Sequence, residues 1–121
     1  MDISSANKDL LLHLMTASTM RAKVLAGNVA NQNTPGYKRR EVAFEDQLAR
    51  EIQRGTSVQD LVKFEPSVSI DTDAEARADG NTVDMESEVS ASRENRILYE
   101  LYAAMLSGGT RLTEIAVRSE R

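Results

Sequence analysis

The chain is organised around the stretch Asn-Val-Ala-Asn-Gln-Asn-Thr-Pro-Gly at residues 28–36, which Tyr37 follows. Asn is a poor helix former, and three Asn residues fall within six positions here. Pro35 disfavours helical geometry at Thr34. Pro35 and Gly36 suit the two central positions of a tight turn, because glycine readily adopts a positive φ. The stretch therefore predicts the end of one helix and a sharp turn.

A long amphipathic helix is expected before this turn, over residues 9–29, after a loose polar segment at residues 1–8. Apolar or small side chains recur in alternating steps of four and three, which is a heptad seam. The seam consists of Leu11, Met15, Ser18, Ala22, Leu25 and Val29. A second row beside it broadens the apolar face and consists of Leu10, Leu14, Ala17 and Val24. Because the apolar face is so wide, this helix is expected to pack against more than one neighbour.

A second long helix is expected after residues 79–84, where Asp-Gly-Asn-Thr-Val-Asp predicts a turn and a helix start with Asp84 as N-cap. The pattern predicts helix from about residue 85 to 107, a break or kink at Gly108 and Gly109, and renewed helix over residues 110–119. In that last part Leu112, Ile115 and Ala116 are expected to face inward.

The middle of the chain gives weaker signals. Residues 44–54 predict a short helix that Gly55 stops, and residues 64–71 predict a short edge strand or extended segment. The stretch of residues 71–82 is rich in acidic side chains and predicts a loop that orders late or not at all.

The expected fold is mainly α, with two long terminal helices paired as a coiled-coil-like hairpin around an irregular middle segment. One domain is expected, in three parts: residues 1–37 with the first helix and turn, residues 38–83 with the middle region and loop, and residues 84–121 with the second helix. Two helices bury little apolar surface alone, so neighbouring subunits are expected to complete the fold.

Composition excludes several classes of protein. The net charge of −4 and the pI near 5.0 argue against a nucleic-acid or anionic-membrane partner. The chain has no Cys, which excludes disulfides and thiolate zinc sites. It has no apolar run of the roughly 20 residues that span a bilayer, and residues 1–5 do not resemble a secretory signal.

The sequence shows no catalytic constellation. His13 is the sole histidine and is expected on the flank of its helix. Ser5 and Lys8 match an S-x-x-K pattern, but the companion motifs of serine acyl-enzymes do not follow. The acidic loop departs from a calcium-binding loop at Ala76 and Thr82. We therefore expect no enzyme activity, no cofactor, no metal and no small-molecule substrate.

Residues 26–37, Ala-Gly-Asn-Val-Ala-Asn-Gln-Asn-Thr-Pro-Gly-Tyr, resemble the ANNxANxxTPGY signature of bacterial flagellar rod and hook proteins, with Gly27 as the departure. Residues 79–88 resemble the DGNxVDxxxE stretch of the proximal rod proteins in that family. The resemblance implies a structural subunit of the flagellar basal-body rod, whose paired terminal helices form the wall of a hollow shaft.

The same resemblance implies a location and partners. Such subunits leave the cytoplasm through the flagellar type III export apparatus without a cleaved signal and join the periplasmic rod, on which motility depends. The implied partners are copies of the chain, other rod proteins, the adaptor between rod and MS ring, the MS ring and the export gate. The residues alone leave an alternative, a cytoplasmic helical adaptor or chaperone that binds a partner helix.

Three groups of residues are candidate sites. The assembly and turn motif comprises Asn28, Asn31, Thr34, Pro35, Gly36 and Tyr37; the second family motif comprises Asp79, Gly80, Asn81, Val83 and Asp84. Both motifs fit two compatible roles, capping and turning within one subunit or contacting the adjacent subunit. Phe44 and Leu48 resemble the F-x-x-x-apolar element that flagellar export substrates present to the export gate, and their spacing also suits an ordinary helix pair.

Overall fold

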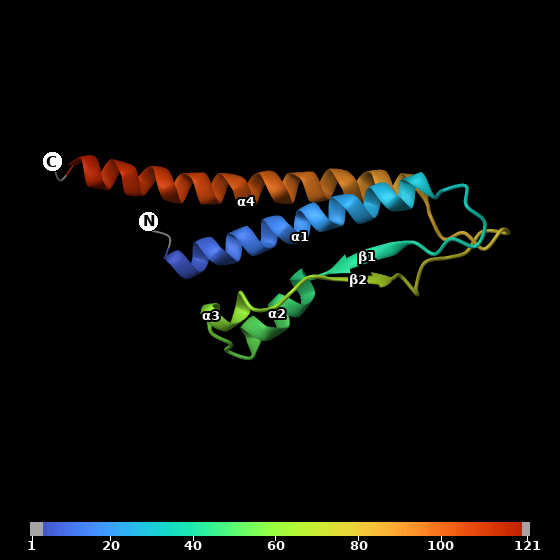
Figure 1. Cartoon of the computed structure of the whole chain (residues 1–121), viewed down its shortest axis with the longest axis horizontal. Helices are drawn as coiled ribbons and strands as arrows, with labels where there is room; N and C mark the ends of the chain where they lie inside the picture. Colours follow the sequence, from blue (N-terminus) through green and yellow to red (C-terminus); the bar gives the residue numbers. More distant parts are fainter. Residues whose placement is uncertain (1–3, 120–121) are drawn as a thin grey trace.

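The computed structural model describes residues 4–119, except the side chains of residues 109–113 and 116. The elements in chain order are α1 (Ser5–Ala30), β1 (Arg40–Ala43), α2 (Glu45–Gln53), α3 (Val58–Leu61), β2 (Ser67–Ile70) and α4 (Met85–Ser119). Figure 1 shows α1 and α4 side by side, with both chain termini at the same end. The predicted mainly α fold with two long terminal helices is confirmed, and the helices are antiparallel.

The heptad seam of α1 packs on α4. Leu11, Ser18 and Leu25 recur every seven residues and are buried, so they form one stripe along the helix. Asn95 of α4 donates a hydrogen bond from Nδ2 to the Ser18 carbonyl oxygen, at 2.9 Å. Ala22 lies on the same seam but is exposed, so the contact between the helices is open at that position.

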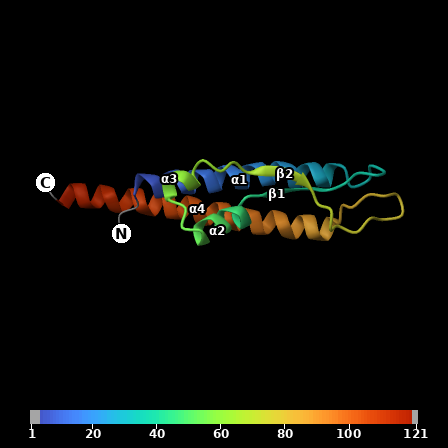
Figure 2. The same cartoon turned by 90° about the horizontal axis from the view of Figure 1, so that it is seen from below.

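The second apolar row of α1 packs on the middle segment. A buried cluster joins Ala17 of α1 to Phe44, Leu48 and Leu61, and Leu10, Leu14 and Phe64 surround it. Figures 1 and 2 show that the strands, α2 and α3 lie along one side of the long hairpin, next to α1. The prediction that α1 needs two neighbours is therefore confirmed. The short helix predicted over residues 44–54 is α2, and it ends before Gly55, whose φ is +79°.

The strands form a two-stranded antiparallel sheet in which Arg40 lies opposite Ile70 and Val42 lies opposite Val68. The extended segment predicted over residues 64–71 is confirmed as β2. Strand β1 was not predicted. Its charged residues obscured the apolar alternation, and its position depends on the partner strand rather than on local propensity.

Side chains of α1 cover the edge of β1 that faces away from β2. Asn28 bonds both backbone groups of Arg40: its Oδ1 accepts from the amide and its Nδ2 donates to the carbonyl, each at 2.9 Å. Two turns earlier, Arg21 donates from Nη2 to the Val42 carbonyl at 3.1 Å. The helix thus supplies the hydrogen bonds that a third strand would otherwise make.

Two helix predictions need correction. The helix α1 begins at Ser5 rather than near residue 9, because the Ser4 hydroxyl caps it by accepting from the Asn7 amide at 3.2 Å.

The helix α4 continues through Gly108 and Gly109 without a break. A glycine costs only about 1 kcal/mol inside a helix, since it keeps its backbone hydrogen bonds. Ile115 is 58% exposed, so it does not face inward within this chain; the side chains of residues 112 and 116 lie outside the described residues.

Residues 71–82 form a loop, as predicted, but the alternative that this loop does not order at all is wrong. The Asp71 amide donates to the Arg39 carbonyl at 3.0 Å, and the Thr82 amide donates to the Tyr37 carbonyl at 3.0 Å. Both ends of the loop are therefore fixed to the segment that follows α1. Acidic composition pointed to disorder, but the specific partners were far away in sequence and not visible in it.

Candidate functional site

The two motifs found in the sequence contact each other where the hairpin closes. The Gly36 amide donates to the Asp79 carbonyl at 2.8 Å, directly linking the turn after α1 to the loop before α4. In Figure 1 this region lies at the end of the molecule opposite both termini. We call residues 28–37 together with residues 79–88 the motif junction.

Asn81 is the centre of the motif junction and is fully buried. Its Nδ2 donates to the carbonyl oxygens of Asn31 at 2.9 Å, Gln32 at 3.2 Å and Thr34 at 2.8 Å. Its Oδ1 accepts from the Val83 amide at 2.7 Å. The Asn81 side chain therefore fixes the turn that follows α1 and, through its oxygen, also shapes the entry into α4.

Two glycines allow the two motif loops to approach. Gly36 has φ +73° and Gly80 has φ +82°, a region that other residues rarely adopt. A Cβ on Gly80 would lie 3.4 Å from the Gly36 Cα, so the loops touch at these positions. Lys38 donates from Nζ to the Gly80 carbonyl at 2.7 Å and closes the same contact.

Asn28 joins three elements at the other side of the motif junction. Besides its two bonds to Arg40 of β1, its Nδ2 donates to Glu88 Oε2 of α4 at 3.2 Å. Its Oδ1 also accepts from the Tyr37 hydroxyl, at 3.3 Å. Asn28 and Glu88 are both fully buried. A buried amide with all of its hydrogen-bonding capacity used fixes the relative positions of α1, β1 and α4.

Arg39 bridges two carboxylates beside Asn28. Its Nε donates to Glu88 Oε1 and its Nη1 donates to Asp71 Oδ2, each at 2.6 Å. The hydrogen bond that Arg39 donates to Glu88 is the main reason that the pKa of Arg39 is raised. Burial is the largest single effect and would raise the pKa of Asp71, but the hydrogen bond and the charge of Arg39, together with backbone hydrogen bonds from Asp73 and Ala74, outweigh it, and the pKa is lowered. Arg39 therefore stays charged and neutralises the buried Glu88.

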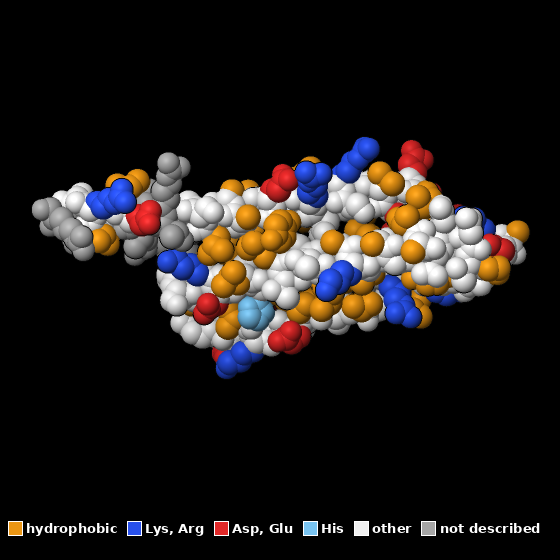
Figure 3. Space-filling view, turned by 45° about the horizontal axis from the view of Figure 1, so that its top comes forward, with side chains coloured by type: hydrophobic (Ala, Val, Ile, Leu, Met, Phe, Trp, Pro, Cys, Tyr) orange, Lys and Arg blue, Asp and Glu red, His pale blue; other side chains and the backbone are white. Residues whose placement is uncertain are grey.

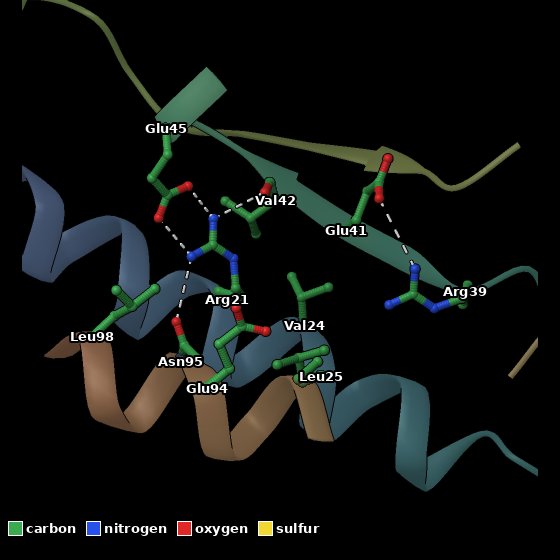
Figure 4. A pocket seen from close by; sticks show the side chains of 11 residues that line it. Arg21, Val24, Leu25, Arg39, Glu41, Val42, Glu45, Glu94, Asn95 and Leu98 are labelled. Atoms are coloured by element: carbon green, nitrogen blue, oxygen red, sulfur yellow. Dashed lines mark hydrogen bonds and ion pairs between the residues drawn. The ribbon is translucent and has the colours of Figure 1, made fainter. Parts of the chain in front are cut away.

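A second polar cluster lies midway along the hairpin, in a cleft of about 360 Å³ between α1, β1 and α4 (Figure 4). Arg21 forms a bidentate ion pair with Glu45 and reaches Asn95 of α4 at 3.4 Å. Burial is the largest single effect and would raise the pKa of Glu45, but the hydrogen bond and the charge of Arg21, together with a backbone hydrogen bond, outweigh it and the pKa is lowered. Arg21 and Glu45 therefore neutralise each other in the cleft, and Arg21 connects α1 to β1, α2 and α4.

The structure brings together some predicted site residues and separates others. Asn28, Asn31, Tyr37, Gly80 and Asn81 meet in the motif junction, with Val83 buried at 2% exposure. The following members of the two motifs are exposed: Thr34, Pro35, Gly36, Asp79 and Asp84.

Asp84 directly precedes α4, and its carboxylate accepts from the Ser87 hydroxyl at 2.6 Å. Phe44 and Leu48 lie elsewhere, in the core beside Ala17, and are 1% and 6% exposed.

Sequence reasoning missed the polar residues that hold the elements together: Arg21, Arg39, Glu45, Glu88 and Asn95. The sequence did contain a signal for these buried positions. Arg21 and Asn28 are seven residues apart, and so are Glu88 and Asn95. Polar residues at heptad positions fall on the buried stripe of a paired helix. In the sequence Glu88 is noted only as the last residue of the second stretch that resembles rod proteins, without a buried role.

The residues that the structure describes form no metal site. They contain no group of three or more His, Asp or Glu side chains placed to hold a metal ion. His13 Nδ1 lies 3.1 Å from the Asp9 carbonyl oxygen of its own helix, consistent with a place on the helix flank. Among these residues, no helix has the length and apolarity needed to cross a membrane.

No family model matches the chain. Individual proteins, however, are similar to this chain in sequence. Over 104 residues the chain is 32% identical to the flagellar basal body rod protein FlgB of Escherichia coli strain K12, covering 73% of this chain and 75% of that protein. The FlgB protein of Aquifex aeolicus is 33% identical over 91 residues, 73% of each chain. That of Bacillus subtilis strain 168 is 26% identical over 116 residues, covering 89% of this chain and 90% of that protein. This chain therefore belongs to the family of flagellar basal body rod proteins named FlgB.

Proposed function

We propose that this chain is a structural subunit of the proximal part of the flagellar rod, where it assembles with copies of itself and with other rod proteins. The position at the base of the rod implies contact with the MS ring and export gate through an adaptor protein. Support comes from the names of the relatives and from the motif junction, in which the two stretches that resemble rod proteins form one hydrogen-bonded unit.

The observation that carries this proposal is the exposed apolar surface of α4. Ile97, Leu101 and Met105 are 65%, 51% and 48% exposed. Fully burying such a side chain contributes about 1.5–3 kcal/mol. A helix that leaves several of them in water is expected to be covered by another chain. A rod wall made of packed hairpins supplies such a cover.

The exposed turn of the first motif is proposed as a second contact with a neighbouring subunit. Thr34 and Pro35 are exposed at the tip of the molecule, while Asn31 and Tyr37 behind them are held within the chain. The turn is thus rigid and projects outward. A pre-ordered loop loses little conformational entropy when it binds, which favours its use as a contact.

We also propose that the chain leaves the cytoplasm unfolded, through the flagellar type III apparatus, with Phe44 and Leu48 engaging the export gate. In the folded chain both side chains are buried, so the gate would recognise them only before folding. Replacing Phe44 with Ala should reduce secretion several-fold. The matched control is Leu61→Ala, which removes a side chain from the same cluster. Equal secretion of the two variants would exclude a gate-specific role for Phe44.

The rod function itself is tested by deleting the gene in the source bacterium and restoring it with the full chain. Cells without the chain should not swim, and purified basal bodies from restored cells should contain it. A density map should place the hairpin in the rod next to the MS ring. Normal swimming without the chain, or its retention in the cytoplasm as expected of a helical adaptor, would refute the proposal.

A further inference from the structure

The small sheet ends in a strand whose outer edge has no neighbour. Among the described residues the sheet contains only β1 and β2, and the other edge of β1 is covered by side chains of α1. We call the side of β2 that faces away from β1 the open edge. It is separate from the apolar side chains gathered along the junction of the two long helices in Figure 3, because strand backbone forms it.

The hydrogen bonds around the sheet show which backbone groups point out of the open edge. Asn28 bonds both backbone groups of Arg40, so these groups of Arg40 point away from β2. In an antiparallel ladder, two residues opposite each other either bond across it or both point outward, and Arg40 lies opposite Ile70. Ile70, and Val68 two residues before it, therefore turn their N–H and C=O groups outward. Within the described part of the chain, these groups have no hydrogen-bond partner.

The residues of the open edge do not shield it. Folded proteins commonly protect an exposed edge with a charged residue or Pro, and residues 67–70, Ser-Val-Ser-Ile, contain neither. Val68 and Ile70 are 46% and 53% exposed, and both side chains lie on the sheet face on which Val42 is buried. The open edge thus offers free backbone groups and an apolar pair of side chains together.

An extended segment is the kind of partner that satisfies both features. The outward groups of Val68 and Ile70 repeat every two residues, about 7 Å apart, which is the repeat of another strand. A helix cannot pair with them, because it uses its own backbone groups internally. Partner residues opposite Val68 and Ile70 place their side chains on the same face of the sheet, so apolar side chains are expected there.

Charges at the two ends of the open edge argue against a second copy of this chain as the partner. Glu65 and Asp73 are exposed, lie three residues outside Val68 and Ile70, and form no ion pair within the described part of the chain. If two copies paired through β2 with Val68 opposite Ile70, Glu65 of each copy would face Asp73 of the other. Like charges that face each other across a ladder destabilise it, whereas Lys or Arg at these positions would be attracted.

We propose that the open edge binds an extended segment of another protein, which adds a third, antiparallel strand to the sheet. The segment carries apolar side chains opposite Val68 and Ile70 and a basic side chain three residues outside each of them. The inference goes beyond the rod function, because it concerns the isolated chain. Absence of the chain from basal bodies would refute the rod function and leave this inference in place.

The test uses a synthetic peptide with blocked ends, Lys-Thr-Thr-Val-Thr-Val-Thr-Thr-Lys, in which the two Val residues are placed to lie opposite Val68 and Ile70. The peptide is titrated into the isotope-labelled full chain and followed by two-dimensional NMR. The amide signals of Val68 and Ile70 should shift, and their hydrogen exchange should slow as the peptide saturates the edge. Unchanged signals with the peptide at millimolar concentration would overturn the proposal.

Two methylated peptides test whether the contact is a strand pairing. N-methylation of both Val residues removes the N–H groups that face the open edge, so binding should weaken at least about tenfold through the lost hydrogen bonds. N-methylation of the Thr after each Val removes N–H groups that face away, and binding should persist. Unless the first peptide binds more weakly than the second, the proposed pairing is wrong.

Two variants of the chain test the edge and its charges. Val68→Pro removes an N–H that the sheet does not use, so the fold should hold while binding falls at least about tenfold. The double variant Glu65→Lys with Asp73→Lys should prefer a peptide with Glu at both ends, the reverse of the unchanged chain. If circular dichroism shows that Val68→Pro is unfolded, this charge reversal decides. An unreversed preference would refute the proposal, and so would amide protection of Val68 that rises with chain concentration alone, because a second copy would then occupy the edge.

Discussion

Replacing Asn81 with Ala should separate the two halves of the motif junction. The substitution removes the donor to the carbonyls of Asn31 and Thr34 and the acceptor for the Val83 amide. The two amide hydrogens of Asn81 and its oxygen count as three hydrogen bonds, each worth about 0.5–1.5 kcal/mol net. Because the site is fully buried, water cannot replace them. We expect a loss of roughly 2–4 kcal/mol in the free energy of unfolding.

The measurement is urea denaturation of the purified chain, followed by far-UV circular dichroism at a concentration where the chain is monomeric. With an m value of about 1–2 kcal/mol/M, the midpoint should fall by about 1–4 M. Asn33→Ala is the matched control: Asn33 has the same side chain in the same turn but is exposed. If the two variants differed by less than about 1 kcal/mol, Asn81 would not hold the junction. Asn81→Asp, which replaces the amide donor by a negative charge facing carbonyl oxygens, should destabilise at least as much as Asn81→Ala.

Three further predictions follow from the geometry of the junction and of the ion pairs. Gly80→Ala should cost about 1–2 kcal/mol of stability, because φ is +82° there; Gly27→Ala, in the open interior of α1, should instead stabilise by about 0.5–1 kcal/mol, and thermal melts compare the two. Glu88→Gln should destabilise by about 3–5 kcal/mol, since it leaves Arg39 without its buried partner, and loss of the β1 amide protection in hydrogen exchange is the readout. Stability should decline with acidification: the pKa values of Glu45 and Asp71 are lowered in the folded chain, so their contribution is complete above the unfolded-state values and disappears as pH falls through the folded-state values. Glu45→Gln should make that decline shallower in pH titrations of the melting temperature, and an unchanged slope would count against the Arg21 pairing.

Local chemistry in the sequence was enough to predict the two long helices and the turn that ends the first of them. Asn31, Thr34, Pro35 and Gly36 end a helix and turn the chain through backbone preferences that act within a few residues. The heptad spacing of Leu11, Ser18 and Leu25 likewise follows from helix geometry alone. Both motifs were likewise found from their residue patterns alone, before the structure showed that they contact each other.

The tertiary structure alone decided which distant residues meet. Asn81 binds carbonyls about fifty positions before it, and Asn28 reaches Glu88 sixty positions later. Neither partner is visible in a local pattern, because a hydrogen bond depends on distance and direction in space rather than on spacing in the chain. The acidic loop was expected to order late or not at all, and β1 was overlooked, for the same reason: each is ordered by groups that only the folded hairpin brings within reach.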